Sequence, residues 1–294
     1  NSVNDLWTQM SFINPGLLGS QPFFQADFVT PIEKKKDEER AQKLQALIKP
    51  FILRRTKDLV ATELPPKTEH LFYCQMSNDQ GEYYEKIKSE YRNELLQSLE
   101  NGTFNKSKVQ FLQGLTKLRQ IANHPEMIDK SYEGDSGKFE NVIHTLENVL
   151  SRGHRALVFS QFVKQLDIYR RYFDAEHIPY AYLDGATKNR GDVVKEFQEK
   201  KDIQLFLISI KAGGVGLNLT EADYVFILDP WWNPAVEQQA IDRTHRIGQT
   251  KNVFIYKFIT KDTVEEKILA LQNRKRNVAE SLIVTEESFT KSLS

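Results

Sequence analysis

From residue 137 onward, short apolar runs alternate with segments of helical length, and this alternation limits the possible folds more than any other feature of the sequence. The runs are rich in β-branched and aromatic residues, which favour strands. Strands separated by helices of this length predict an α/β fold, a parallel sheet with helices on both faces. The expected strands are Ala156–Phe159, Tyr180–Leu183, Leu205–Ile208, Tyr224–Leu228 and Val253–Phe258, and the expected helices are Lys138–Ser151, Phe162–Ala175, Arg190–Glu199 and Pro234–Arg246. Such sheets bind ligands at the carboxyl ends of their strands, so the loops there form the candidate site.

The part before residue 137 is predicted to be mainly helical. Apolar residues at helical spacing predict a helix from Val3 to Ile13. Ser77–Glu100 is expected to form a long helix with Ser77 as its N-cap, and Lys106–Ala122 a second one. Gly134–Gly137 is typical of a linker and marks the expected domain boundary. The mixed charge run from residue 33 to 40 suits a solvated helix or loop, and we assign no chemistry to it.

Composition excludes several classes of protein. The 294 residues, enough for about two domains, hold 40 Lys and Arg against 40 Asp and Glu, so the chain is not uniformly basic, although a local basic face remains possible. The single cysteine, Cys74, can form neither an internal disulfide nor a cysteine-rich zinc site, which favours a reducing compartment. No apolar run approaches the ~20 residues of a membrane helix. We expect an intracellular protein with no membrane partner.

The segment Ser209–Asn218 contains three glycines directly after an expected strand. Glycines allow backbone N–H groups to approach phosphate oxygens closely. The segment is neither GxGxxG nor GxxxxGK[ST], so it supports neither a dinucleotide fold nor a complete phosphate-binding loop. A tight turn that needs positive φ is the alternative. The pair Gly137-Lys138 is likewise not part of a Walker motif.

Two arginines are candidates for phosphate chemistry. In the expected helix that starts at Asn233-Pro234, Gln239, Arg243 and Arg246 follow one another at spacings of four and three, which predicts one shared face. Two guanidinium groups on one face can clamp phosphate charge. The structural alternative pairs the arginines with neighbouring acidic residues, Asp242 or Glu237. His245 is expected to be a packing residue.

Four runs together make the sequence recognisable: ALVFSQF (156–162), YLDGATKNR (182–190), ISIKAGGVGLNLT (208–220) and DPWWNPAVEQQAIDRTHRIGQT (229–250). In this order they closely resemble the second RecA-like lobe of SWI/SNF-type ATP-dependent DNA translocases, the chromatin-remodeller branch of superfamily-two helicases. PFILRRTKDLVATELPPKTE (50–69) and LRQIANHPEMI (118–128) also resemble family blocks. The resemblance therefore covers nearly the whole chain.

The resemblance implies roles for particular residues. Arg243 and Arg246 would be arginine fingers that reach the phosphates of ATP. The residues expected to face the nucleotide are Gly214, Gly216, Asn218 and Gln239. Those expected to touch the backbone of double-stranded DNA, without reading bases, are Ser160, Gln161, Gly185, Thr187, Ser209 and Lys211. The chain departs from the commoner family pattern at Ile210 and Lys211, where Thr-Arg or Thr-Lys is more usual, and at Trp231. Ile210 donates no side-chain hydrogen bond, unlike the threonine that is more usual at this position.

The resemblance also implies that this chain is part of a larger machine. It has no Walker A loop or DEAH-type box, begins without Met, and therefore is expected to be cut behind the family's third motif. ATP and Mg²⁺ would be held mainly by a missing N-terminal lobe, so the fragment alone is expected to be inactive, with no metal ligands of its own. Its partners would be double-stranded DNA, that lobe and protein–DNA complexes, in the cytoplasm or nucleoid of a bacterium or the nucleus of a eukaryote.

The resemblance assigns the chain to four parts: residues 1–76 as the tail of the first lobe, 77–136 as a helical protrusion and linker, 137–262 as the second lobe, and 263–294 as a brace helix and tail. The basic run Arg274–Arg276 would be either a DNA-facing patch or a solvated helix end. Two other readings are a catalytically silent RecA-like interaction module and a small-molecule α/β enzyme. The retained arginines disfavour the first, and the lack of a catalytic carboxylate or nucleophile in the candidate loops disfavours the second.

Overall fold

The computed structural model describes residues 3–35, 37–52, 61, 63–101, 104–212 and 217–282. These fall into two compact units. The first contains the described residues of Asn1–Glu63, Asn233–Ala235 and Ala270–Ser294, and the second contains those of Leu64–Trp232 and Val236–Leu269.

The first unit is helical around a small apolar core. Its N-terminal elements are α1 (Val3–Ile13), α2 (Gln21–Phe24), η1 (Gln25–Val29), η2 (Pro31–Lys35), α3 (Glu38–Ile48) and η3 (Lys49–Phe51). Helix α1 has the predicted bounds, and Gly16 follows it at a φ of 87°. Met10, Phe24 and Leu44 are buried in the shared core. The predicted charge run enters α3, where Asp37 caps the helix by accepting a hydrogen bond from the Arg40 N–H at 3.0 Å.

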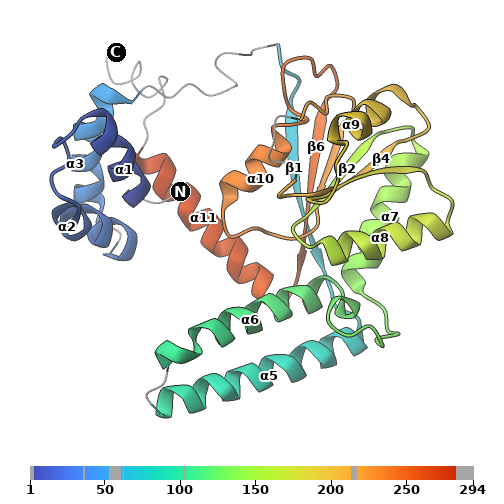
Figure 1. Cartoon of the computed structure of the whole chain (residues 1–294), viewed down its shortest axis with the longest axis horizontal. Helices are drawn as coiled ribbons and strands as arrows, with labels where there is room; N and C mark the ends of the chain where they lie inside the picture. Colours follow the sequence, from blue (N-terminus) through green and yellow to red (C-terminus); the bar gives the residue numbers. More distant parts are fainter. Residues whose placement is uncertain are drawn as a thin grey trace. The chain divides into compact units, whose positions relative to one another are not determined.

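The second unit is built on a six-stranded, all-parallel sheet in the order β1-β6-β5-β2-β4-β3 (Figure 1). The strands are β1 (Lys67–Cys74), β2 (Ala156–Ser160), β3 (Tyr180–Leu183), β4 (Leu205–Ser209), β5 (Tyr224–Ile227) and β6 (Val253–Thr260). Five of them were predicted within two residues at each end. The predicted α/β fold is confirmed.

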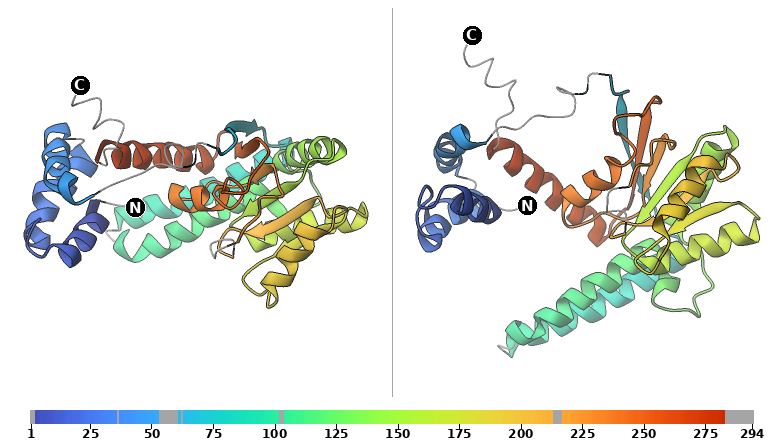
Figure 2. Two further views of the ribbon diagram at one scale, coloured as in Figure 1. Left: turned by 90° about the horizontal axis from the view of Figure 1, so that it is seen from above. Right: turned by 45° about the horizontal axis from the view of Figure 1, so that its top comes forward.

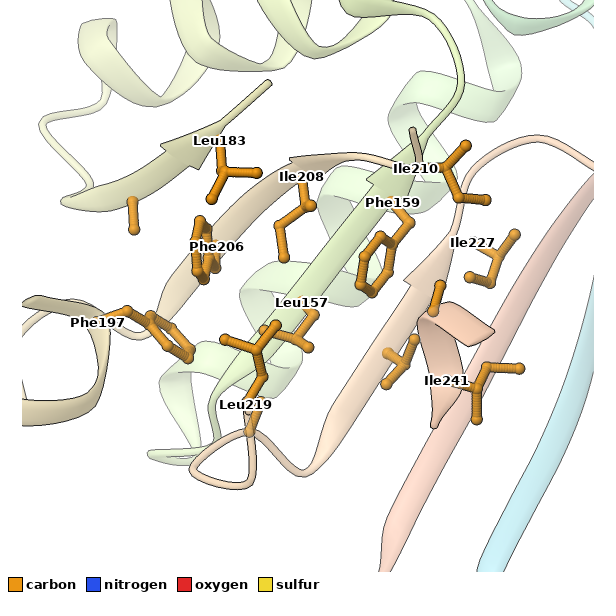
Figure 3. Packing of buried hydrophobic residues seen from close by; sticks show 14 of the residues in the cluster. Leu157, Phe159, Leu183, Phe197, Phe206, Ile208, Ile210, Leu219, Ile227 and Ile241 are labelled. Carbon is orange, nitrogen blue, oxygen red and sulfur yellow. The ribbon is translucent and has the colours of Figure 1, made fainter. Parts of the chain in front are cut away.

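Successive residues of each central strand enter opposite apolar cores, because side chains alternate across a strand. In β2, Leu157 and Phe159 belong to one core, whereas Ala156 and Val158 belong to the other. Helices α9 (Arg190–Glu199) and α10 (Pro234–Ile241) contribute to the first core, which Figure 3 shows. Helices α7 (Gly137–Ser151) and α8 (Val163–Ala175) contribute to the second. Burial on both faces explains why these strands are continuously apolar.

Strand β1 was not among the strands predicted for the sheet. It pairs in parallel with β6 from Lys67↔Val253 to Cys74↔Thr260, whereas the predicted boundary places these residues with the preceding lobe. Only Cys74 of β1 is buried. An edge strand of this kind is held by backbone hydrogen bonds to its neighbour, so its side chains carry no pattern of burial.

Helices α5 (Asn78–Glu100) and α6 (Phe104–Asn123) lie side by side as a long hairpin (Figure 2). The predicted N-cap of α5 is confirmed, since the Ser77 hydroxyl accepts a hydrogen bond from the Gln80 N–H at 3.2 Å. A short turn, η4 (Pro125–Met127), follows the hairpin. At its base, the Tyr84 hydroxyl accepts a hydrogen bond of 2.9 Å from the N–H of Val264, the first residue of α11 (Val264–Leu282).

No helix in the described part of the chain has the length and apolar character needed to cross a membrane.

Candidate functional site

The carboxyl edge of the sheet gathers the predicted DNA-contacting residues. Ser160 and Ser209 end neighbouring strands and are register partners. The Ile210 N–H donates to the Ser160 carbonyl at 2.8 Å, so the turns after β2 and β4 are joined. Gly185 and Thr187 follow β3, the next strand along. Since all these strands are parallel, their following loops meet at one edge, where ligands of α/β sheets bind.

Asp229, which follows β5, organises the turn after β2. Its carboxylate accepts hydrogen bonds from the Ser160 hydroxyl at 2.6 Å, from the Gln161 N–H at 3.2 Å, and from the Gln161 side chain. Ser160 is only 1% exposed and its hydroxyl points inward. A serine hydroxyl carries one proton, so a hydroxyl that donates to Asp229 cannot also donate to phosphate in this conformation.

Asp229 is itself buried. Burial raises the pKa of its carboxyl group, while the nearby charge of Arg119 and the hydrogen bonds from Ser160 and Gln161 oppose that rise without cancelling it. The carboxylate is therefore held by several donors and by a cation, as a buried acidic group requires.

The turn after β3 is held by Asp184. Its Oδ1 accepts from the N–H of Ala186 at 2.9 Å, from the N–H of Thr187 at 3.0 Å and from the Thr187 hydroxyl at 2.9 Å. Burial alone would raise the pKa of Asp184, but these hydrogen bonds, with one from Tyr182, lower it. Gly185 is exposed, and a Cβ atom added there would meet no atom within 4 Å. The backbone at Gly185 is therefore accessible, whereas the Thr187 side chain is hydrogen-bonded within the turn.

The turn after β4 combines buried and exposed residues. Ser209 is buried, Lys211 is exposed, and Ile210 belongs to the apolar core that Figure 3 shows. The isoleucine at position 210, where the family more often has threonine, is therefore explained by packing, since its side chain fills this core. Gly214 and Gly216 lie outside the described residues. Asn218 is exposed, and its carbonyl accepts a 2.8 Å hydrogen bond from Gln198.

The expected helix through Arg246 is shorter than predicted. Helix α10 ends at Ile241, so Arg243 and Arg246 lie in the turns that follow it. The prediction that these arginines share one helical face with Gln239 was therefore wrong. Several backbone hydrogen bonds there span three residues instead of the four of an α-helix, such as the one from the Arg243 N–H to the Ala240 carbonyl at 3.2 Å. At the end of these turns, Gly248 has a φ of 102°, a left-handed value that a helix cannot include.

The turn that carries Arg243 lies beside the end of the glycine-rich loop. The Leu219 N–H donates to the Arg243 carbonyl at 3.1 Å, which brings Asn218 next to this turn. Gln249 closes the turn by donating to the carbonyls of Thr244 and Ala222 at 3.2 and 2.9 Å. Two groups of predicted nucleotide-site residues, far apart in sequence, are therefore adjacent.

The remaining candidates have varied surroundings. Arg246 and Gln239 are exposed. Glu237, one acidic partner considered for the arginines, is buried, accepts a 2.7 Å hydrogen bond from the Trp231 N–H and lies 3.6 Å from the Lys257 ammonium. His245 is buried, with its Nε2 atom 2.8 Å from the Pro65 carbonyl.

A buried ion pair lies next to this edge, and sequence reasoning missed it. Lys138 donates to Glu265 at 2.6 Å, to the Leu228 carbonyl at 2.9 Å and to the Asn123 side chain at 3.0 Å. Burial raises the pKa of Glu265, and Lys138 opposes that rise. The only sequence signal was the pair Gly137-Lys138, which the structure explains as packing and ion pairing rather than phosphate binding.

In the described residues, no group of three or more His, Cys, Asp or Glu side chains could hold a metal ion.

The six-stranded parallel sheet with helices on both faces matches the RecA-like cores of solved SWI2/SNF2 ATPases. The SNF2-related domain matches residues 1–127, and the helicase conserved C-terminal domain matches residues 137–248. The chain belongs to the SNF2 family, the SWI/SNF-type branch of the helicases, as the resemblance implied.

Relatives and solved structures agree with this assignment. The chain is 36% identical over its whole length to an uncharacterized ATP-dependent helicase of Mycoplasma genitalium, and 35% identical over 92% of its length to the mouse SWI/SNF-related matrix-associated actin-dependent regulator of chromatin subfamily A member 1. It spans 28% and 26% of these relatives. The solved Sulfolobus solfataricus SWI2/SNF2 ATPase core in complex with double-stranded DNA is 38% identical, with a TM-score of 0.61 over 100% of this chain and 62% of that one.

Proposed function

We propose that this chain is the C-terminal half of a double-stranded-DNA-dependent ATPase and translocase. The observation that carries the proposal is the gathering of the turns after β2, β3 and β4 at one edge of the sheet, with the turn of Arg243 hydrogen-bonded to Leu219. The relatives are ATP-dependent helicases, and a similar core has been solved with duplex DNA. ATP and Mg²⁺ would be held mainly by an N-terminal lobe that acts as this chain's partner.

Within this proposal, Arg243 and Arg246 stabilise the negative charge that develops when phosphate is transferred. Asn218 and Gln239 face the nucleotide, as would Gly214 and Gly216. The exposed Lys211 and the open backbone at Gly185 meet DNA phosphates directly, while Ser160, Ser209 and Thr187 shape the turns around them. The second lobe would then include strand β1 as well as residues 137–262, residues 77–136 would be its protrusion, and α11 the brace.

ATP hydrolysis with and without duplex DNA tests this proposal. The full-length protein should hydrolyse ATP faster when DNA is added, whereas the 294 residues alone should show no turnover, because they contain no Walker A motif. A full-length protein that DNA does not stimulate would contradict the proposed function. DNA-stimulated turnover by the purified 294-residue chain would contradict the assignment of ATP binding to the other lobe.

Binding of the full-length protein to DNA should depend on salt but not on sequence. The proposed contacts come from backbone groups and from Lys211, which meet phosphates and carry no base information. We expect equal affinity for unrelated duplexes of the same length, and weaker binding as salt rises. Fluorescence anisotropy would measure both. A preference for one sequence by more than about 1 kcal/mol, the low end of a single base-reading contact, would show that the site reads bases.

A further inference from the structure

Arg119, on helix α6 of the hairpin, reaches the turn that follows β5. It is buried, with 4% of its surface exposed. Its Nη2 atom donates to the Pro230 carbonyl at 2.8 Å and lies 3.9 Å from Oδ1 of Asp229. A hairpin helix therefore supplies the cation that accompanies the buried carboxylate of the sheet.

The same guanidinium group also contacts the turn after β2. Its central carbon lies 5.2 Å from the ring centre of Phe162 and 5.4 Å from that of Trp232. Phe162 follows the Ser160-Gln161 turn, and Trp232 follows Pro230, so one side chain contacts both turns. Arginine suits this position because its planar group can stack on rings while its N–H groups donate in the plane.

Asn123, four residues after Arg119 on α6, is connected to the loop after β2 through Gln165. Its side chain donates to the Arg119 carbonyl at 2.8 Å and accepts from Gln165 at 3.0 Å. The Gln165 Oε1 atom lies 2.8 Å from the Ser160 hydroxyl. Helix α6 thus approaches the turn after β2 through two side chains.

A purely structural role for Arg119 would be charge compensation for Asp229. That role needs a cation near the carboxylate, but it does not need the hydrogen bond to the Pro230 carbonyl or contact with rings from both turns. The Gln161 N–H and side chain are bonded to the same carboxylate that Arg119 accompanies. A displacement of Asp229 would therefore displace Gln161 and the turn after β2, which the family resemblance places among the DNA-contacting segments.

We propose that Arg119 is a positioning residue for DNA binding: through Asp229, Pro230 and the two rings it holds the turn of Ser160 and Gln161 after β2 in the conformation that lies against the DNA backbone. The inference rests on the proposed function. It also gives the α5–α6 hairpin a direct connection to the DNA-contacting edge.

The test measures ATP hydrolysis by the full-length protein against duplex DNA concentration, for the wild type, Arg119→Met, Arg119→Lys and Arg171→Met. Arg119→Met should raise the DNA concentration for half-maximal stimulation about tenfold, the equivalent of one lost charged hydrogen bond, and retain the maximal rate within about twofold. Arg171 is the control, since it is an exposed arginine that pairs with Glu126. Its variant should match the wild type in both quantities.

A double-mutant cycle with Gln161→Ala separates positioning from stability. If Arg119 acts through Gln161, then Arg119→Met should change the half-maximal DNA concentration less than twofold once Gln161 is alanine. Independent tenfold effects that multiply in the double variant would overturn the proposal. So would an unchanged half-maximal concentration in Arg119→Met.

Arg119→Lys covers the case in which Arg119→Met fails to fold, which its thermal midpoint would reveal. Lysine keeps a charge near Asp229 but loses the planar group that contacts Pro230 and both rings. We expect a half-maximal DNA concentration several-fold above wild type, and wild-type behaviour would overturn the proposal. A wild-type protein that DNA does not stimulate would overturn the proposed function as well, whereas a stimulated wild type with normal Arg119 variants would overturn this inference alone.

Discussion

Replacing Arg243 or Arg246 by alanine in the full-length protein should abolish ATP hydrolysis and leave DNA binding intact. A positioned arginine stabilises the charge that develops during phosphoryl transfer, and in other systems its loss lowers the rate by roughly 10³ to 10⁵. The structure supports this assignment by position: Arg246 is exposed, and the backbone of Arg243 is bonded to Leu219 beside the glycine-rich loop. The measurements are the turnover at saturating DNA and the thermal midpoint, on the same variants.

The control for these variants is Arg152→Ala. Arg152 is exposed at the C-terminal end of α7, which precedes β2, so it lies away from the carboxyl edge of the sheet. Its variant should keep normal turnover. If Arg243 and Arg246 serve only in surface ion pairs, each alanine variant should lose about 0 to 1 kcal/mol of stability and keep its activity. Near-normal turnover in both variants would therefore refute the arginine-finger assignment. If the thermal midpoint falls sharply, the loss of activity is explained by unfolding.

Gly137→Ala should strongly destabilise the folded protein. Gly137 is the first residue of α7, and an added Cβ atom would lie 1.9 Å from the carbonyl oxygen of Gln75. The carbonyl belongs to the backbone and the position of a Cβ atom is fixed by its own backbone, so neither can rotate away, and the helix must shift. Such a shift would also disturb Lys138, the next residue, in its ion pair with Glu265. We expect a loss of about 3 kcal/mol, the upper end for an overpacked core.

Gly191→Ala provides the matched control for Gly137→Ala. Gly191 is the second residue of α9, and a Cβ atom added there meets nothing within 4 Å. Alanine favours helix, so this variant should be unchanged or more stable by up to ~1 kcal/mol. Urea unfolding followed by circular dichroism would compare the two. Equal stability of both variants would mean that α7 can shift away from Gln75 at little cost.

The central strands could be predicted because their pattern is local. In Ala156–Ser160 and Leu205–Ser209 every residue is buried, and each run is apolar up to its final serine. Strand β1 shows the opposite case. Its position depends on backbone pairing with β6, nearly 190 residues later, and no side-chain period records that pairing.

The candidate site divides in the same way. The resemblance of the ordered motifs to the family identified the loops that the parallel sheet brings to one edge. It did not reveal that α10 ends at Ile241 or that the Ser160 hydroxyl points toward Asp229. Both depend on hydrogen bonds to partners elsewhere in the chain, such as the one from Leu219 to Arg243.

By itself the sequence determined the α/β class, most helix and strand positions and the family, because hydrophobic period, capping residues and motif order are properties of short segments. Only the tertiary structure decided which polar groups meet. Arg119 donates to a carbonyl 111 residues away, and Lys138 to a carboxylate 127 residues away. Buried charges need such partners, and it is the packing of the sheet against its helices that brings these partners within hydrogen-bonding distance.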